Sequence, residues 1–199
     1  NRRSSERTHL TSTEHKVPRR QGRPEGSTAS ETRAVLIDAA QELFGIHGLG
    51  GVSLSGVAGA AGLTGPSIYN HFSSKDELFI DCVVKMYEDI STAFSESGKG
   101  PGDWSTRVKQ VLETATTLYR EDARLQRLGL QASLEVGRDP QRFSMIQDAK
   151  RKVDEAFIGI VITATQEGAL PADADPTICG ELLAASIMGA VAQLTSERT

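Results

Sequence analysis

Two short apolar segments separated by a glycine turn, within residues 52–75, constrain the fold of this chain more than any other feature. The first segment has apolar residues at helical spacing, namely Leu54, Val57, Ala58 and Ala61. Ser53 precedes it, and its hydroxyl can accept a hydrogen bond from a free N–H group of the first turn. Gly62 follows where a helix C-terminus needs a left-handed backbone. The pattern predicts a short helix that ends at this glycine.

The second segment predicts another short helix, from Gly65 to Phe72. Pro66 is tolerated there because the N–H groups of a first turn have no partner within the helix, and Thr64 is a candidate cap. Ile68 and Phe72 are four residues apart, so both can face a core. Two short helices joined by a glycine-containing turn are typical of the helix-turn-helix motif, whose second helix enters the major groove of DNA.

With its neighbours, this stretch resembles the N-terminal domain of TetR-type (TetR/AcrR) transcriptional repressors. Between Glu31 and Tyr87 the matching residues read, in order, AAQELFGIHG, SLSGVAGAAGLTGPSIYNHF and SSKDELF. The resemblance implies that Lys75 contacts a phosphate and that the second short helix faces DNA with Ser67, Tyr69, Asn70 and His71. Packing of Tyr69 and His71 against the first helix, and simple solvation of Asn70, are the alternatives.

Other residues near the motif are candidates for DNA contact. The absence of a side chain at Gly65 lets the helix end approach the phosphate backbone, and the Thr64 hydroxyl can cap the helix or reach a phosphate. Ser53 begins the first short helix, and Arg33 supplies a positive charge. The second helix itself contains no Arg or Lys, so we expect phosphate attraction to come from its neighbours.

Residues 1–29 carry seven Arg or Lys side chains against three acidic ones and almost no apolar side chains. Such a segment cannot offset its ordering entropy, so we expect it to be disordered when free. It is either a solvated tail or a basic arm that places Arg19, Arg20 and Arg23 in a minor groove.

The remaining chain shows helical periodicity and no alternation bounded by hairpin turns, which predicts an all-α fold. We expect a three-helix DNA-binding domain over residues 30–74 and a helical regulatory and dimerisation domain over residues 75–199. Three glycines and a proline within residues 95–102 predict a linker inside the second domain.

A final helix, near Pro176 to Ser196, combines small and apolar side chains. A DNA reader with so few charges should need a twofold partner, and this helix offers a dimer surface through Leu182, Ala185, Met188, Gly189 and Ala192. The resemblance implies that the last two helices form a four-helix bundle with those of a second subunit. The alternative is a helix that serves the core alone.

The second domain also has more apolar side chains than a DNA-binding module needs. As a set, six of them can line an apolar cavity for a small molecule: Trp104, Tyr119, Leu128, Phe143, Ile146 and Phe157. A filled core is the alternative for each residue, and the resemblance favours an inducer pocket.

These inferences lead to one hypothesis with a rival. The hypothesis is a ligand-responsive regulator that binds double-stranded DNA at a palindromic operator as a homodimer and is released by a small apolar inducer. The resemblance favours a repressor, although the residues themselves do not separate repression from activation. The rival is a helical protein-interaction adaptor of the same fold without specific DNA binding.

Composition argues against several other classes of protein. The net charge of −4 and the pI near 5.6 argue against a nonspecific coat on nucleic acid, so DNA binding must be local. No HExxH, GxSxG, P-loop or Cys/His metal spacing occurs, so we expect no enzyme, no metal and no cofactor. Two distant cysteines, and no run of ~18 uninterrupted apolar residues, predict a cytoplasmic protein without a membrane span.

Overall fold

The computed structural model describes residues 28–196 as a succession of helices, with no strand in that range, which confirms the all-α fold. In chain order these helices are α1 (Ala29–Gly51), α2 (Leu54–Ala60), the 3-10 helix η1 (Gly65–Asn70), α3 (Lys75–Gly98), α4 (Trp104–Glu121), α5 (Ala123–Arg138), α6 (Ser144–Gln166) and α7 (Pro176–Ser196).

Capping side chains determine where α1 and α3 begin. At α1, the Thr28 hydroxyl accepts from the Glu31 N–H at 3.2 Å, and the Glu31 carboxylate accepts from the Thr28 N–H at 2.7 Å. At α3, the Ser74 hydroxyl accepts from the Glu77 N–H at 3.1 Å. The Glu77 carboxylate accepts instead from the hydroxyl and N–H of Ser73, at 2.6 and 2.8 Å, and these hydrogen bonds lower the pKa of Glu77. The start of α3 is thereby fixed relative to the segment before it.

The turn between α2 and η1 is a Schellman motif. Gly62 has a φ of 70°, which confirms the expected left-handed glycine. Its N–H donates to the Gly59 carbonyl at 3.1 Å, and the Leu63 N–H donates to the Ala58 carbonyl at 2.8 Å. Two carbonyls at the end of α2 are satisfied in this way, so the chain can reverse within three residues.

The predicted second helix of the motif is present, but it is a 3-10 helix over Gly65–Asn70, so the predicted end at Phe72 is wrong. The N–H and hydroxyl of Ser67 both donate to the Thr64 carbonyl, at 3.0 and 2.6 Å, so the chain closes over three residues rather than four. Pro66 provides no N–H. The Thr64 side chain makes no capping hydrogen bond, so the expected cap is also wrong.

The connection between α3 and α4 is shorter than the linker expected over residues 95–102. α3 continues to Gly98, and only residues 99–103 join it to α4. Gly98 is buried against α6, where a β-carbon would lie 2.6 Å from the Ile160 side chain. This glycine is the last residue of α3, and its lack of a side chain permits close packing of α3 on α6.

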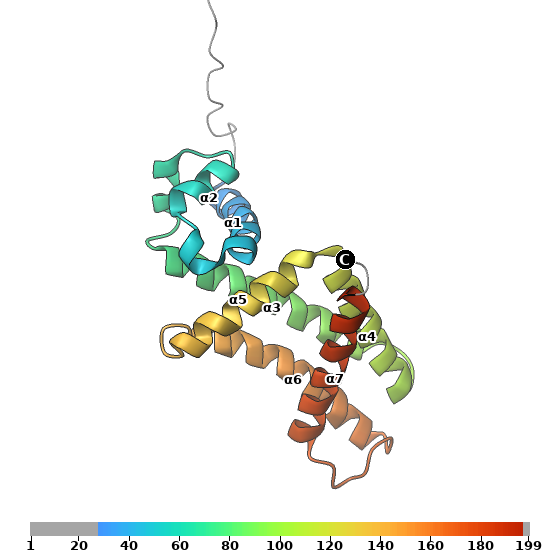
Figure 1. Cartoon of the computed structure of the whole chain (residues 1–199). Coiled ribbons are helices and arrows are strands. Elements are labelled where there is room, and N and C mark those ends of the chain that lie inside the picture. Colours follow the sequence, from blue (N-terminus) through green and yellow to red (C-terminus); the bar gives the residue numbers. More distant parts are fainter. Residues whose placement is uncertain (1–27, 197–199) are drawn as a thin grey trace, which may run out of the picture.

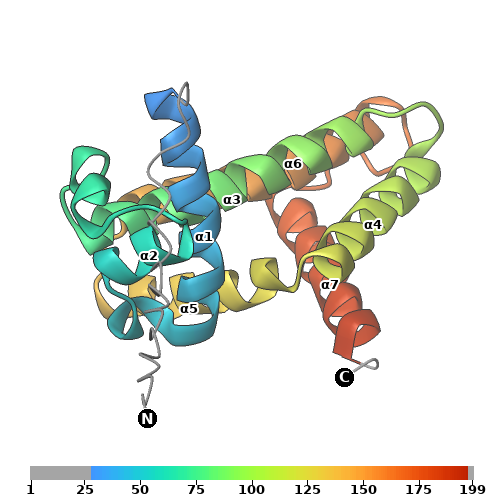
Figure 2. The same cartoon turned by 90° about the horizontal axis from the view of Figure 1, so that it is seen from above.

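The helices form two groups that share α3 (Figures 1 and 2). α1 packs against α2 and the first part of α3, whereas α6 lies alongside α3 and α7 packs on α6 and α4. α1 also contacts α5. Edge-to-face rings connect the groups, because Phe79 of α3 lies 5.1 Å from Phe44 of α1 and 6.0 Å from Phe143, between ring centroids. The core is therefore continuous from the helix-turn-helix into the second group.

Candidate functional site

The helix η1 holds polar side chains at the surface while apolar neighbours anchor it. Ile68 and Phe72 are buried, whereas Tyr69 is 62% exposed and Asn70 is also exposed. Tyr69 is thus not packed against the first helix. The guanidinium of Arg33 from α1 lies over the Phe72 ring, and this contact joins the end of the turn to α1. A rigid turn with an outward phenol is suited to contact with another molecule.

A small hollow of about 90 Å³ lies beside this turn. Thr32 of α1 contributes to its wall, and Gly65 is half-buried close by. The wall also includes four residues expected on DNA: Thr64, Ser67, Asn70 and His71. The structure therefore brings hydroxyl, amide and imidazole groups together without an Arg or Lys among them. Such groups can contact phosphates or base edges by donating or accepting hydrogen bonds.

Ser53 is exposed at the start of α2, where it acts as the expected cap. Its hydroxyl accepts from the Gly56 N–H at 3.1 Å and lies 3.3 Å from the Ser55 hydroxyl. A phosphate at this helix end would therefore meet a hydroxyl pair and backbone N–H groups rather than a charged side chain.

The two candidate cations of the described motif differ in their partners. Arg33 forms an ion pair with Asp81 and lies over the Phe72 ring, 4.8 Å from its centroid, so it joins α1 to α3. Lys75 is half-buried at the first position of α3 and forms no ion pair within residues 28–196. An approaching phosphate can therefore pair with Lys75 more easily than with Arg33. The predicted arm residues Arg19, Arg20 and Arg23 lie outside the described residues.

A cavity of about 540 Å³ lies in the second group of helices, between α3, α4, α5, α6 and α7. Tyr119 and Phe157, two of the six residues expected to bind a ligand, line this cavity. The other four lie elsewhere. Trp104 is half-buried at the start of α4, and three residues are buried in the core: Leu128, Phe143 and Ile146. The cavity is thus present, but most of its wall comes from other side chains.

Sequence reasoning missed the residues that give this cavity its chemistry. Tyr87 of α3 lines it beside Met86, and an ion pair between Lys150 and Asp154 of α6 lies at its edge. Burial, and then the charge of Asp154, raises the pKa of Tyr87. The four-residue spacing of Lys150 and Asp154 was a usable signal for an ion pair on a helix, but not for its place at a cavity.

The α7 helix leaves one apolar side uncovered in the single chain. Leu182 is 63% exposed, and Ile178, Ala185, Gly189 and Ala192 are exposed at helical intervals along the same helix. Ile162 of α6 is also exposed. Met188, the fifth residue expected at a dimer surface, is half-buried and lines the cavity instead. The structure thus presents four of the five predicted dimer residues at the surface.

The uncovered side also explains the strong hydropathy of α7. Although its apolar run is interrupted, Pro176–Leu194 has a mean hydropathy of 1.5 and is long and apolar enough to cross a membrane by length and composition only. Helices that pack on other helices pass the same test, and α7 packs on α4 and α6. The hydropathy is therefore weak support for a membrane span.

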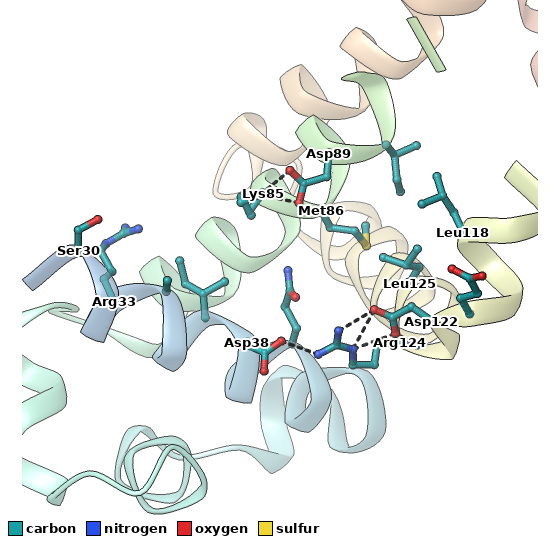
Figure 3. Close-up of a pocket in the computed structure, with 15 residues that line it drawn as sticks. Ser30, Arg33, Asp38, Lys85, Met86, Asp89, Leu118, Asp122, Arg124 and Leu125 are labelled. Carbon is teal, nitrogen blue, oxygen red and sulfur yellow. Dashed lines mark hydrogen bonds and ion pairs between the residues drawn. The ribbon is translucent and has the colours of Figure 1, made fainter. Parts of the chain in front are cut away.

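A second, more polar groove of about 620 Å³ lies at the junction of α1, α3 and the α4–α5 corner (Figure 3). Arg124 bridges this junction, because its guanidinium lies 2.7 Å from both Asp38 of α1 and Asp122. Arg127 of α5 also reaches Glu42 of α1, at 3.2 Å. These pairs hold α1 against the start of α5.

The groove and the cavity share a wall. Met86, Ile90 and Leu125 line both of them. Leu125 is adjacent in sequence to Arg124, whose guanidinium pairs with Asp38 of α1. The geometry therefore connects the cavity to the first helix of the helix-turn-helix.

Sequence comparison identifies relatives over most of the chain. Residues 36–82 match the family model described as bacterial regulatory proteins of the tetR family. The HTH-type transcriptional regulator UidR of Escherichia coli (strain K12) is 23% identical over 85% of this chain and 84% of its own length. The HTH-type transcriptional repressor KstR2 of Mycobacterium tuberculosis (strain CDC 1551 / Oshkosh) is 28% identical over 72% of this chain and 71% of its own.

Solved structures share the fold beyond the helix-turn-helix. The crystal structure of FadR from Bacillus subtilis, in complex with stearoyl-CoA, has a TM-score of 0.71 with this chain at 18% identity, and the match covers 83% of this chain and 89% of FadR. The matched motif, the exposed turn that it forms and the relatives along most of the sequence agree with one another: residues 36–82 form a DNA-binding domain of the tetR type, and the chain is similar to TetR-type transcriptional regulators over most of its length.

Proposed function

We propose that this protein is a ligand-responsive repressor that binds a palindromic operator as a homodimer and leaves it when a small molecule occupies the cavity. The observation that carries the proposal is η1, which buries Ile68 and Phe72 and exposes Tyr69 and Asn70. Two similar proteins support the proposal: KstR2 is described as a transcriptional repressor, and FadR was solved in complex with stearoyl-CoA.

The uncovered side of α7 supports the homodimer. Exposed apolar side chains on a helix favour contact with another protein surface, and Gly189 and Gly159 have open space around their α-carbons, with nothing within 4 Å of an added β-carbon. Small residues of this kind let two helices approach closely. A second copy of α6 and α7 would cover Leu182 and Ile162, and it would set two η1 helices at a fixed spacing along DNA.

The wall shared by cavity and groove supports release by a ligand. Occupation of the cavity would move Met86 and Leu125, the latter adjacent to Arg124, which holds Asp38 of α1. Typical coupling between two sites is about 1–3 kcal/mol, which corresponds to a loss of operator affinity of roughly 5–150-fold.

Within this proposal the chain divides by role. Residues 30–74 bind DNA, residues 75–199 bind the ligand and the second subunit, and α3 belongs to both parts. The seven basic side chains of residues 1–29 add phosphate contacts that η1 lacks. A protein with this role acts in the cytoplasm.

Selection of bound sequences from a random pool of double-stranded DNA tests the proposal, with the full chain as bait. A homodimeric reader should enrich a palindrome whose half-sites lie about one helical turn apart, or a multiple of it. Tyr69→Ala should abolish the enrichment. A protein-interaction adaptor, which the absence of Arg and Lys from η1 leaves as the rival, would enrich no palindrome, and that result would refute the proposal.

A further inference from the structure

We propose that the cavity among α3–α7 selects an uncharged, largely apolar molecule with one hydroxyl or carbonyl oxygen, which the phenol groups of Tyr87 and Tyr119 bind. This inference rests on the proposed function, in which the cavity holds the inducer, and it names the chemical class of that inducer. Its volume of about 540 Å³ is within the usual range for small-molecule sites.

Most of the cavity wall is apolar and can hold hydrocarbon of various shapes. The wall includes Met86, Ile90, Val153, Phe157 and Val191. Methionine and branched aliphatic side chains contribute affinity through buried area and adapt to the outline of a ligand. The selectivity of the site must therefore come from its few polar groups.

Two of these polar groups are phenols without a partner. Tyr87 and Tyr119 are both half-buried, and within residues 28–196 neither hydroxyl takes part in a hydrogen bond. Burial, with a further contribution from Tyr87, raises the pKa of Tyr119 to about 12, so this phenol stays protonated at neutral pH and can donate. A ligand that covered either hydroxyl without accepting from it would remove that hydroxyl from water at a cost. A ligand oxygen that accepts from one phenol avoids this cost.

The charged groups at the cavity already satisfy each other. The Lys150 ammonium lies 3.0 and 3.3 Å from the two carboxylate oxygens of Asp154. Of the described residues that line the cavity, these two alone carry formal charge, so the pair is neutral as a unit. The Ser133 hydroxyl donates to the Gly129 carbonyl at 3.0 Å and is likewise engaged.

This balance disfavours a charged ligand. A carboxylate that approached Lys150 would also lie beside the Asp154 carboxylate, which would repel it, whereas an ammonium would be repelled by Lys150. Bringing an uncompensated charge into a site that is partly out of water carries a large desolvation cost. A neutral oxygen meets neither obstacle, because it needs only the phenols.

Calorimetric titration of the purified full-length protein, without DNA, tests the inference with matched probes. Naphthol, naphthalene and naphthoate share one ring frame, and octanol and octanoate supply a second shape. The neutral alcohols should bind, and each carboxylate should bind roughly tenfold more weakly than its alcohol or not at all. The inference is overturned if a carboxylate binds as tightly as its alcohol, or if no neutral probe of either shape binds.

Three substitutions test which polar groups of the cavity bind the ligand or exclude anions. Tyr87→Phe and Tyr119→Phe keep the ring, and at least one of them should weaken naphthol binding by about fivefold while leaving naphthalene binding unchanged. Asp154→Asn leaves Lys150 without its counter-charge, so it should reverse the preference and make octanoate bind more tightly than octanol. An unchanged preference in Asp154→Asn would show that the ion pair does not exclude anions.

Two glycines of α5 provide a matched pair of substitutions that tests where the probes bind. A β-carbon at either Gly129 or Gly137 would meet nothing within 4 Å, but only Gly129 lines the cavity. Gly129→Leu should therefore abolish probe binding and Gly137→Leu should preserve it, although both gain the same helix propensity. Equal behaviour of the two variants would place the binding elsewhere. Because these titrations contain no DNA, failure here leaves operator selection as a separate test of the repressor proposal.

Discussion

At the scale of single residues, Tyr69 lies between two anchors and is itself free. Ile68 and Phe72 are buried on either side of it in sequence, and the Tyr69 ring is 62% exposed. The exposed phenol contributes little to the core, so the fold does not require it, whereas the proposed contact with DNA does. Substitution at this position therefore separates folding from binding.

We expect Tyr69→Ala to weaken operator binding at least tenfold, which corresponds to about 1.4 kcal/mol, because it removes an outward hydroxyl and ring. The midpoint of thermal unfolding should hardly change, since surface substitutions usually stay within about 0.5 kcal/mol. Fluorescence anisotropy with the selected operator and thermal melts would measure both. Leu130→Ala, at a residue of equal exposure on α5, is the control and should alter neither quantity.

At the scale of helices, α2 and the turn that follows it contain glycines with opposite requirements. Gly59 lies inside the helix with open space around it, whereas Gly62 has a φ of 70° in the turn that follows. An alanine suits the first position and is strained at the second, because a β-carbon is disfavoured in the left-handed region. The same substitution should therefore have opposite effects at positions three residues apart.

Gly59→Ala should raise the free energy of unfolding by about 0.5–1 kcal/mol, through helix propensity and reduced freedom of the unfolded chain. Gly62→Ala should lower it by about 1–2 kcal/mol. Urea unfolding followed by circular dichroism would show both shifts. Destabilisation by Gly59→Ala would mean that the packing of α2 requires a glycine here, contrary to the open space around this residue.

The start of α5 depends on one carboxylate. Asp122 caps the helix through the Arg124 N–H at 2.9 Å, and its carboxylate also accepts from the Arg124 guanidinium, which lowers the pKa of Asp122 below its ordinary value of 3.8. A lowered folded-state pKa gives stability that is present above the unfolded pKa and is lost as pH falls through the folded pKa. The contact between α5 and α1 should therefore weaken in acid.

Asp122→Asn keeps the cap, since Asn and Asp cap similarly, and removes the charge that pairs with Arg124. The variant should have a lower urea midpoint than the natural protein at about pH 7. The difference should persist to about pH 5 and narrow below about pH 4, as Asp122 in the natural protein becomes protonated. A difference that stays constant over this range would assign the effect to something other than the charge.

At the scale of the whole molecule, the exposed side of α7 decides whether one chain can act alone. Leu182 and Ile162 leave apolar area on α7 and α6 that nothing in the described chain covers. The two half-sites of an operator would be read together only if this area is buried between subunits. Assembly and DNA binding are therefore coupled in the proposal.

Leu182→Arg should convert the protein to a monomer, because it places a charge in the middle of the proposed contact. Light scattering after size exclusion would give the mass, and operator affinity should fall together with it. Leu130→Arg changes an equally exposed apolar side chain on α5 and should leave the mass unchanged. A dimeric Leu182→Arg protein would contradict the α6–α7 contact.

Local pattern was sufficient for the helix-turn-helix. The spacing of Ile68 and Phe72, the cap at Ser53 and the left-handed Gly62 all act within a few residues, so each could be assigned from sequence and each is confirmed. The same reasoning did not predict the 3-10 form of η1. Whether the Thr64 carbonyl accepts from Ser67 depends on backbone angles rather than on residue type.

What the sequence by itself determined is therefore the class of the fold and which short segment is turned outward. Only the tertiary structure decided which aromatic side chains line the cavity, because Phe143 and Phe157 are alike in sequence and differ in what packs against them. Each ring meets a phenylalanine of α3, Phe79 for Phe143 and Phe94 for Phe157, but only Phe157 also borders the space between five helices. The position of a cavity depends on how distant helices cross, and periodicity along one helix carries no information about that crossing.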